Sequence, residues 1–129
     1  MAALANGTMG YACDFEPHHP EAILHPIAVM VPTALAVGER TGARGIDLLG
    51  AVTLGCEVEY RVSMAIGPVQ MYDLGFHPSA VAGCFGATAA AAWLRISWTT
   101  GWIPALCALR SLTGRKMTVL SGETFMVKK

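Results

Sequence analysis

Hydrophobic positions recur along this chain at the spacing of α-helices, and no stretch alternates apolar and polar residues as a β-strand does. The clearest apolar stripe consists of Ile46, Leu49, Val52 and Cys56. This stripe predicts a helix over residues 46–66 that ends at Gly67 and Pro68, and Glu57 and Arg61 stand one turn apart on it, where they can pair. The pattern as a whole predicts an all-α fold.

Two further long helices are predicted where apolar runs follow His-Pro pairs. The first covers residues 26–41, because proline suits the first helical position and Gly42 suits the end, while Pro32 predicts a kink or a break inside it. The second covers residues 78–96. Small residues recur in it at every fourth position, at Ala82, Gly86 and Ala90. Because they let a neighbouring backbone approach closely, we expect this helix in the middle of a helical bundle.

The remaining segments lack a long apolar repeat. We predict a short helix over residues 2–12, weakened by its glycines, and a proline-containing loop over residues 15–24. A second loop covers residues 67–76. Beyond the long helices, residues 103–112 are compatible with one more helix, and residues 114–129 show no element.

Length and composition describe a single domain with a sizeable core. The chain has 129 residues, of which 53% are hydrophobic and only 14% are charged. Its formal net charge is zero at pH 7, which argues against a nucleic-acid partner, because such proteins carry a basic surface.

Two long runs raise the question of a membrane. Residues 78–94 are uncharged, and residues 22–38 contain His25 as their one ionisable side chain. Both runs are at or below the lower limit of about 17–25 apolar residues for a spanning helix, and both are rich in Ala, Gly and Pro. Buried helices of a soluble protein explain them better, and a small membrane protein is the less favoured alternative.

The cysteine pattern indicates thiols and not disulfides. Four cysteines lie far apart in apolar surroundings, without a Cys-x-x-Cys pair: Cys13, Cys56, Cys84 and Cys107. The start of the chain does not resemble a signal peptide. We therefore expect buried free thiols in a reducing cytoplasm.

The polar segment 14–26 is the best candidate for chemistry, because it holds three of the four histidines and three of the nine acidic residues. His25 and His77 each precede a proline at a predicted helix start, where backbone N–H groups and the positive end of the helix dipole favour anions and a neutral imidazole. Such an imidazole beside a bound carboxylate can act as a general acid or base near pH 7. Asp14 nearby favours catalysis, and the alternative is that both histidines merely cap helices.

A metal site is a weaker interpretation of the same segment. Its possible ligands are Asp14, Glu16, His18, His19 and His25. Neither an HExxH helix nor paired cysteines are present, so the spacing does not define a coordination geometry. Glycine-rich phosphate-binding and dinucleotide-binding motifs are also missing, and we predict no metal and no cofactor.

Four blocks of the sequence are distinctive in order and spacing. They are residues 3–16 (ALANGTMGYACDFE), Leu24-His25-Pro26, residues 47–58, and residues 75–83 (GFHPSAVAG). In these blocks the chain resembles the MmgE/PrpD family, which includes 2-methylcitrate dehydratases and cis-aconitate decarboxylase. The resemblance is strong over residues 1–95, whereas residues 96–129 match weakly or form a divergent tail.

For the fold, the resemblance implies part of the family's helical core domain, without the separate lid domain, and a homodimer. Family members are considerably longer, so we expect residues 1–129 to be a single partial domain from a fragment or truncated chain that is inactive alone. A catalytically inactive helical oligomerisation module is the alternative function.

For the chemistry, the resemblance implies metal-independent acid/base catalysis on small di- and tricarboxylates such as 2-methylcitrate, by loss of water or of carbon dioxide. Asp14, His25 and His77 match positions that line the family's active site. Lys128 matches the position of the family's active-site lysine, and its alternative role is part of a solvated basic terminus.

Overall fold

The structure, a computed structural model, describes the backbone of residues 1–100 and the side chains of residues 1–96. The regular elements within these residues are α-helices: α1 (Ala2–Tyr11), α2 (Ile27–Thr41), α3 (Gly45–Ile66), α4 (Pro68–Asp73) and α5 (Pro78–Thr100). The predicted all-α fold is confirmed, and the long helices lie within a few residues of their predicted bounds.

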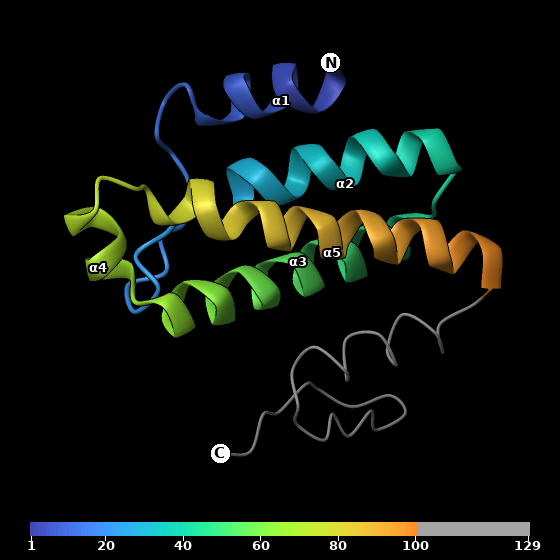
Figure 1. Ribbon diagram of the computed structural model, residues 1–129. Helices are drawn as coiled ribbons and strands as arrows, with labels where there is room; N and C mark the ends of the chain where they lie inside the picture. The colour runs from blue at the N-terminus through green and yellow to red at the C-terminus, as the bar shows by residue number, and fades with distance from the viewer. Residues whose placement is uncertain (101–129) are drawn as a thin grey trace.

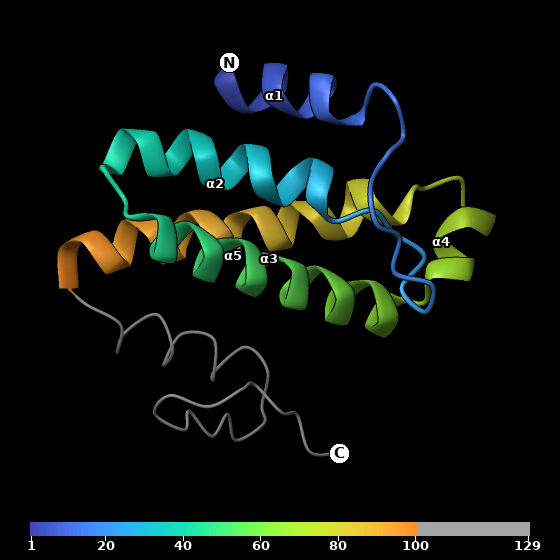
Figure 2. The same ribbon diagram turned by 180° about the vertical axis from the view of Figure 1, so that it is seen from behind.

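Helices α2, α3 and α5 lie side by side, and α5 contacts both of the others (Figure 1). Helices α3 and α5 run antiparallel, since Gly50 lies beside Trp93 and Gly55 lies beside Gly86. Helix α1 packs on α2, on the side away from α3, and none of its residues is buried (Figure 2). The predicted place of residues 78–96 in the middle of a bundle is therefore confirmed.

Glycines allow the close approach of α3 and α5. A Cβ atom added to Gly86 would lie 2.6 Å from the backbone oxygen of Gly55, and one added to Gly55 would lie 3.1 Å from the oxygen of Gly86. Ala90 of α5 and Met30 of α2 fill the space around this contact. The prediction that small residues of this helix let a neighbouring backbone approach closely is confirmed. Contact between backbone atoms sets the distance between α3 and α5.

The face of α3 that packs into the bundle differs from the prediction. Its buried residues recur at every fourth position and are small or polar: Asp47, Ala51, Gly55, Glu59 and Ser63. Of the predicted apolar stripe, Ile46 is 56% and Leu49 is 66% exposed, whereas Val52 packs partly against the core. The predicted stripe is wrong as a core face, because the close approach to α5 selects small side chains over large ones.

The loop before α2 belongs to the core and is confirmed as non-helical. Ala22 and Leu24 are fully buried and pack with Ala82 of α5. The Ser63 hydroxyl of α3 donates a hydrogen bond of 2.7 Å to the carbonyl oxygen of Ala22. This burial fixes the path of the loop between α1 and α2.

Of two local predictions about proline, the first needs correction. Residues 67–76 contain the short helix α4 in place of a continuous loop, because Gly67 adopts a φ of 94° and Pro68 then occupies a first helical position. Helix α2 continues through the buried Pro32, which has no N–H to donate, so the predicted break is confined to the hydrogen-bond ladder and does not end the helix.

One helical stretch of the described residues, Pro78–Ile96, is long and apolar enough by composition to cross a membrane, with a mean hydropathy of 1.3. It packs against α2 and α3, and its buried residues include Ala82, Ala90 and Leu94. About a third of this stretch is buried inside the described structure.

The cysteines within the described residues are free, as predicted, but they are not all buried. Cys13 and Cys84 are exposed, and Cys56 is half-buried. Burial and the nearby Glu59 raise the pKa of Cys56 to about 11. The prediction of buried thiols is therefore wrong for two of them, because Cys13 lies in the exposed turn after α1 and Cys84 on the exposed side of α5.

Cys107, Lys128 and the helix predicted over residues 103–112 lie outside the described residues.

We expect Gly86→Ala to destabilise the fold by about 1–3 kcal/mol, since the new methyl group must push apart two helix backbones. Gly10→Ala is the matched control, because nothing lies within 4 Å of its added Cβ and alanine favours a helix. Chemical denaturation of both variants measures the difference. Equal stability of the two variants would contradict the proposed role of the close approach.

Candidate active site

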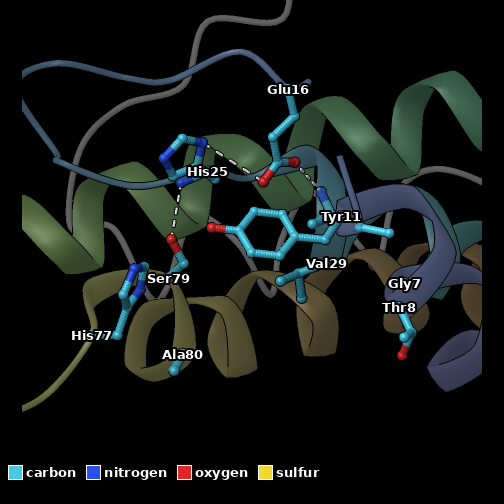
Figure 3. A pocket seen from close by; sticks show the side chains of 11 residues that line it. Gly7, Thr8, Tyr11, Glu16, His25, Val29, His77, Ser79 and Ala80 are labelled. Atoms are coloured by element: carbon cyan, nitrogen blue, oxygen red, sulfur yellow. Dashed lines mark hydrogen bonds and ion pairs between the residues drawn. The ribbon is translucent and has the colours of Figure 1, made fainter. Parts of the chain in front are cut away.

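A pocket of about 780 Å³ lies where α1, the following loop and the first turns of α2 and α5 meet (Figure 3). Its size is within the range typical of small-molecule sites. The lining residues are Gly7, Thr8, Tyr11, Ala12, Glu16, His25, Ala28, Val29, His77, Ser79 and Ala80. Most of the wall is apolar, and the polar groups come from separate parts of the sequence.

The two histidines predicted for the site line the same pocket. His77 directly precedes α5, and its carbonyl oxygen accepts hydrogen bonds from the N–H groups of Ala80 and Val81. His25 lies two residues before α2, and its backbone N–H donates a 2.9 Å hydrogen bond to the Ser79 hydroxyl. That bond joins the start of α2 to the first turn of α5. The prediction that both histidines stand at helix starts is confirmed.

Glu16 connects the loop to both His25 and helix α2. One of its carboxylate oxygens accepts a 2.6 Å hydrogen bond from the N–H of Ala28, and the other lies 3.7 Å from Nδ1 of His25 (Figure 3). Its side chain is only 5% exposed. A carboxylate is favourable here because the first turn of a helix carries unpaired N–H groups and the positive end of the helix dipole. Glu16, and not a histidine side chain, therefore caps α2.

Glu16 is not among the residues predicted for catalysis, although it lies in the polar segment around them. A signal for it exists in the sequence, since it is an acidic residue in a loop that leads to a helix start. Two neighbouring carboxylates, Asp14 and Glu16, were equally available there. The fold decides between them by burying one and exposing the other.

Asp14 is exposed and does not line the pocket. Its backbone adopts a φ of 53°, and its N–H donates a 3.0 Å hydrogen bond to the carbonyl oxygen of Tyr11, which closes the turn after α1. Glu16 lines the pocket and Asp14 does not, so the structure does not bring Asp14 together with the two histidines.

The other histidines of the polar segment have different surroundings. His18 is exposed, and its ring centroid lies 5.0 Å from that of His25 at the edge of the site. His19 packs on Tyr60 with ring centroids 4.2 Å apart, and its Nδ1 accepts a hydrogen bond from the N–H of Ala22. Among residues 1–96, no three His, Cys, Asp or Glu side chains gather in a group that could hold a metal ion.

Behind the pocket lies a second carboxyl group, Glu59 of α3. It is fully buried, and neither of its oxygens has a hydrogen-bond partner among the described residues. Burial, with a contribution from the charge of Glu16, raises its pKa to about 8. Burial and nearby acidic groups also raise the pKa of Tyr11 in the pocket wall. Glu59 is therefore mainly protonated at neutral pH.

The arrangement suits acid/base chemistry on an anion. Two imidazoles face one cavity from different helix starts, where backbone N–H groups favour negative charge. The carboxylate of Glu16 lies beside His25, with Oε1 3.7 Å from Nδ1. The pocket therefore combines an environment that favours an anion with two imidazoles, the side chains that serve most often as general acids and bases.

Several known proteins are similar in sequence to this chain. Residues 1–127 match the sequence model of the MmgE/PrpD N-terminal domain. The cis-aconitate decarboxylase-like protein oryM of Aspergillus oryzae is 32% identical over 98 residues, which are 70% of this chain and 20% of that protein. The cis-aconitate decarboxylase of Mus musculus is 33% identical over 95 residues, 70% of this chain and 19% of that protein. The enzyme of the same name from Aspergillus terreus is 30% identical over 87 residues, 64% and 18% of the two chains.

The chain thus spans about a fifth of the length of these curated relatives. No solved structure matches it significantly. The match of residues 1–127 to the family model establishes the family of this chain, and the activity of the longer proteins is a matter for a proposal.

The raised pKa of Glu59 predicts a pH-dependent stability. The folded protein holds this proton up to about pH 8, whereas the unfolded chain releases it near the ordinary value of 4.5, so folding stability falls as pH rises through that window. We expect Glu59→Gln, which cannot ionise, to raise the melting temperature, by a few degrees or more at pH 8 and little at about pH 5. Melting curves across this range measure the difference.

The matched control for this prediction is Glu57→Gln. Glu57 lies two residues away on α3 and is 43% exposed at its side chain, where it pairs with Arg61. It should show no comparable growth of the melting temperature with pH. A stabilisation by Glu59→Gln that is the same at both pH values would contradict the buried, protonated state of Glu59.

Proposed function

Because this chain belongs to the MmgE/PrpD family, we propose that its pocket binds small di- or tricarboxylates and supplies acid/base groups of a lyase. The observation that carries the proposal is the convergence of His25 and His77 on one cavity, with Glu16 against His25. The relatives named as cis-aconitate decarboxylases support the class of ligand.

In the proposed binding mode, a ligand carboxylate lies near the first turn of α5, because the carboxylate of Glu16 already occupies the start of α2. Backbone N–H groups at helix starts and protonated imidazoles both stabilise a negative charge there. The apolar wall formed by Val29, Ala28 and Ala80 packs against the carbon skeleton. Ser79 fixes the relative position of the two histidines because it accepts a hydrogen bond from the backbone of His25.

In the proposed chemistry, the two histidines divide the proton transfers. For loss of water, one imidazole removes a proton from the carbon next to a carboxylate, and the other protonates the departing hydroxyl group. For loss of carbon dioxide, an imidazolium protonates the carbon from which the carboxylate leaves. Glu16, whose Oε1 lies 3.7 Å from Nδ1 of His25, is the carboxylate partner of this histidine in the proposed chemistry, in place of Asp14. Lys128 remains a predicted carboxylate-binding group outside the described residues.

We expect this chain to bind citrate and cis-aconitate, and His25→Gln and His77→Gln each to weaken binding roughly tenfold at about pH 6.5. The reason is that each variant removes a charge-assisted hydrogen bond, which contributes about 1.5–3 kcal/mol. Isothermal titration calorimetry gives the dissociation constants. His19→Gln is the control, since His19 packs on Tyr60 outside the pocket. Equal weakening by all three variants, or by none, would exclude this pocket as the carboxylate site.

A second candidate function is self-association through helix α3. Ile46 and Leu49 lie one turn apart on the face opposite its buried residues, and Met64 lies on the same face near the other end of the helix. Exposed large apolar side chains of this kind are typical of a protein interface. We infer that a second copy of the chain packs on this face, in accordance with the homodimer that the family resemblance implies.

Leu49→Lys should convert this dimer to a monomer, because it places a charge among these apolar side chains. Light scattering coupled to size-exclusion chromatography measures the mass. Leu4→Lys on α1 is the control, since Leu4 is as exposed as Leu49, at 67% against 66%, but lies on another helix. A wild-type chain that is already monomeric at high concentration would rule out this second candidate.

A further inference from the structure

Tyr11, the last residue of α1, lines the pocket and has no role in the binding mode described above. Its ring lies edge-on to the ring of His25, with the centroids 6.1 Å apart and the planes at 69°. Its hydroxyl end points toward His25 and Ser79 (Figure 3). The side chain is 42% exposed, and its hydroxyl group makes no hydrogen bond to another residue in the described part of the chain. Tyr11 therefore offers an unused hydrogen-bond donor to the cavity.

The other hydroxyl and carboxyl groups of the pocket wall already have partners. Glu16 is an anion bonded to the start of α2. The Thr8 hydroxyl of α1 donates a 2.9 Å hydrogen bond to the carbonyl oxygen one turn earlier in its own helix. The Ser79 hydroxyl of α5 accepts the backbone N–H of His25 and keeps its own proton for a ligand. On the α1 side of the pocket, the hydroxyl proton that is still available thus belongs to Tyr11.

The chemistry of this donor suits an anionic ligand. Burial and the charges of Asp14 and Glu16 raise the pKa of Tyr11, so its hydroxyl group is protonated and neutral at neutral pH. A hydrogen bond from such a group to an ionised carboxylate is stronger than one to an uncharged acceptor. Tyr11 can therefore contribute to the binding of a carboxylate without adding a charge to the pocket.

The position of α1 gives this contact a structural consequence. Among the described elements α1 packs on α2 and not on α5, and none of its ten residues is buried. A helix of this length is marginal without tertiary contacts, and elements that bury little apolar surface open most readily. His77 and Ser79 at the start of α5 line the same pocket as Tyr11. A ligand that binds at both places would connect two helices that do not otherwise pack on each other.

We propose that the Tyr11 hydroxyl group donates a hydrogen bond to the ligand carboxylate at the first turn of α5, so that the bound ligand joins α1 to α5. This inference deepens the proposed function and rests on it, because the class of ligand is the one proposed there. Tyr11 is then a ligand-binding residue, and the ligand stabilises α1 against local opening.

The first test is the affinity for citrate, measured by isothermal titration calorimetry at about pH 6.5. Tyr11→Phe removes the hydroxyl group and keeps the ring beside His25, and we expect it to raise the dissociation constant roughly five- to tenfold. Tyr72→Phe is the matched control. Tyr72 is 45% exposed and lies edge-on to His77 at 5.5 Å and 73°, but it does not line the pocket. It should retain the affinity of the wild type.

The second test is amide hydrogen exchange over residues 2–11, with and without saturating citrate. Exchange in α1 should slow several-fold when the wild type or Tyr72→Phe binds citrate, because the ligand then holds α1 in place. Tyr11→Phe should show little of this slowing even when it is saturated. The wild-type measurement needs no variant, so it tests the link between α1 and α5 even if a substitution disturbs folding.

The proposal would be overturned by wild-type affinity in Tyr11→Phe, by equal weakening in both tyrosine variants, or by unchanged exchange of α1 in the citrate-bound wild type. If His25→Gln and His77→Gln still weaken citrate binding in that case, the proposed function stands and only the role of Tyr11 fails. A wild-type chain that binds neither citrate nor cis-aconitate overturns both. Circular dichroism of each variant checks that the helices are intact.

Discussion

The close approach of α3 and α5 is the constraint on which the rest of this structure depends. Gly55 and Gly86 face each other with no room for a side chain, so the register between the two helices is fixed by backbone contact. This register places the first turn of α5, with His77 and Ser79, against the loop that carries His25. The pocket therefore depends on small residues far from its lining.

The same close approach creates the unusual electrostatics behind the pocket. The face of α3 that fits against the glycines of α5 buries Asp47, Glu59 and Ser63, and Glu59 is among the largest fully buried side chains of the described residues. Arg44 pairs with Asp47, and Ser63 binds the loop, but Glu59 has no such partner among the described residues. Its carboxyl group remains buried because protonation removes most of the desolvation cost.

The segments that precede α2 and α5 supply the polar side chains at the front of the pocket. The segments before α2 and α5 each bring a histidine to the positive end of a helix, and Glu16 neutralises that end at α2. Loops on a rigid bundle can place polar groups in this way, whereas the helices themselves supply the apolar wall. In the proposed binding mode, the helices therefore bind the ligand's carbon skeleton and the segments before them recognise its charge.

The sequence by itself determined the helices, the two histidines at helix starts and the family, because these depend on local spacing, proline positions and motif order. Tertiary structure decided which face of α3 is buried, and it decided that Glu16 and not Asp14 meets His25. Neither outcome is local: the first depends on the distance between two backbones, and the second on the start of α2, whose Ala28 N–H binds the carboxylate of Glu16. Hydrophobic periodicity predicts that a helix forms, but only packing shows which small or polar residues its partner requires.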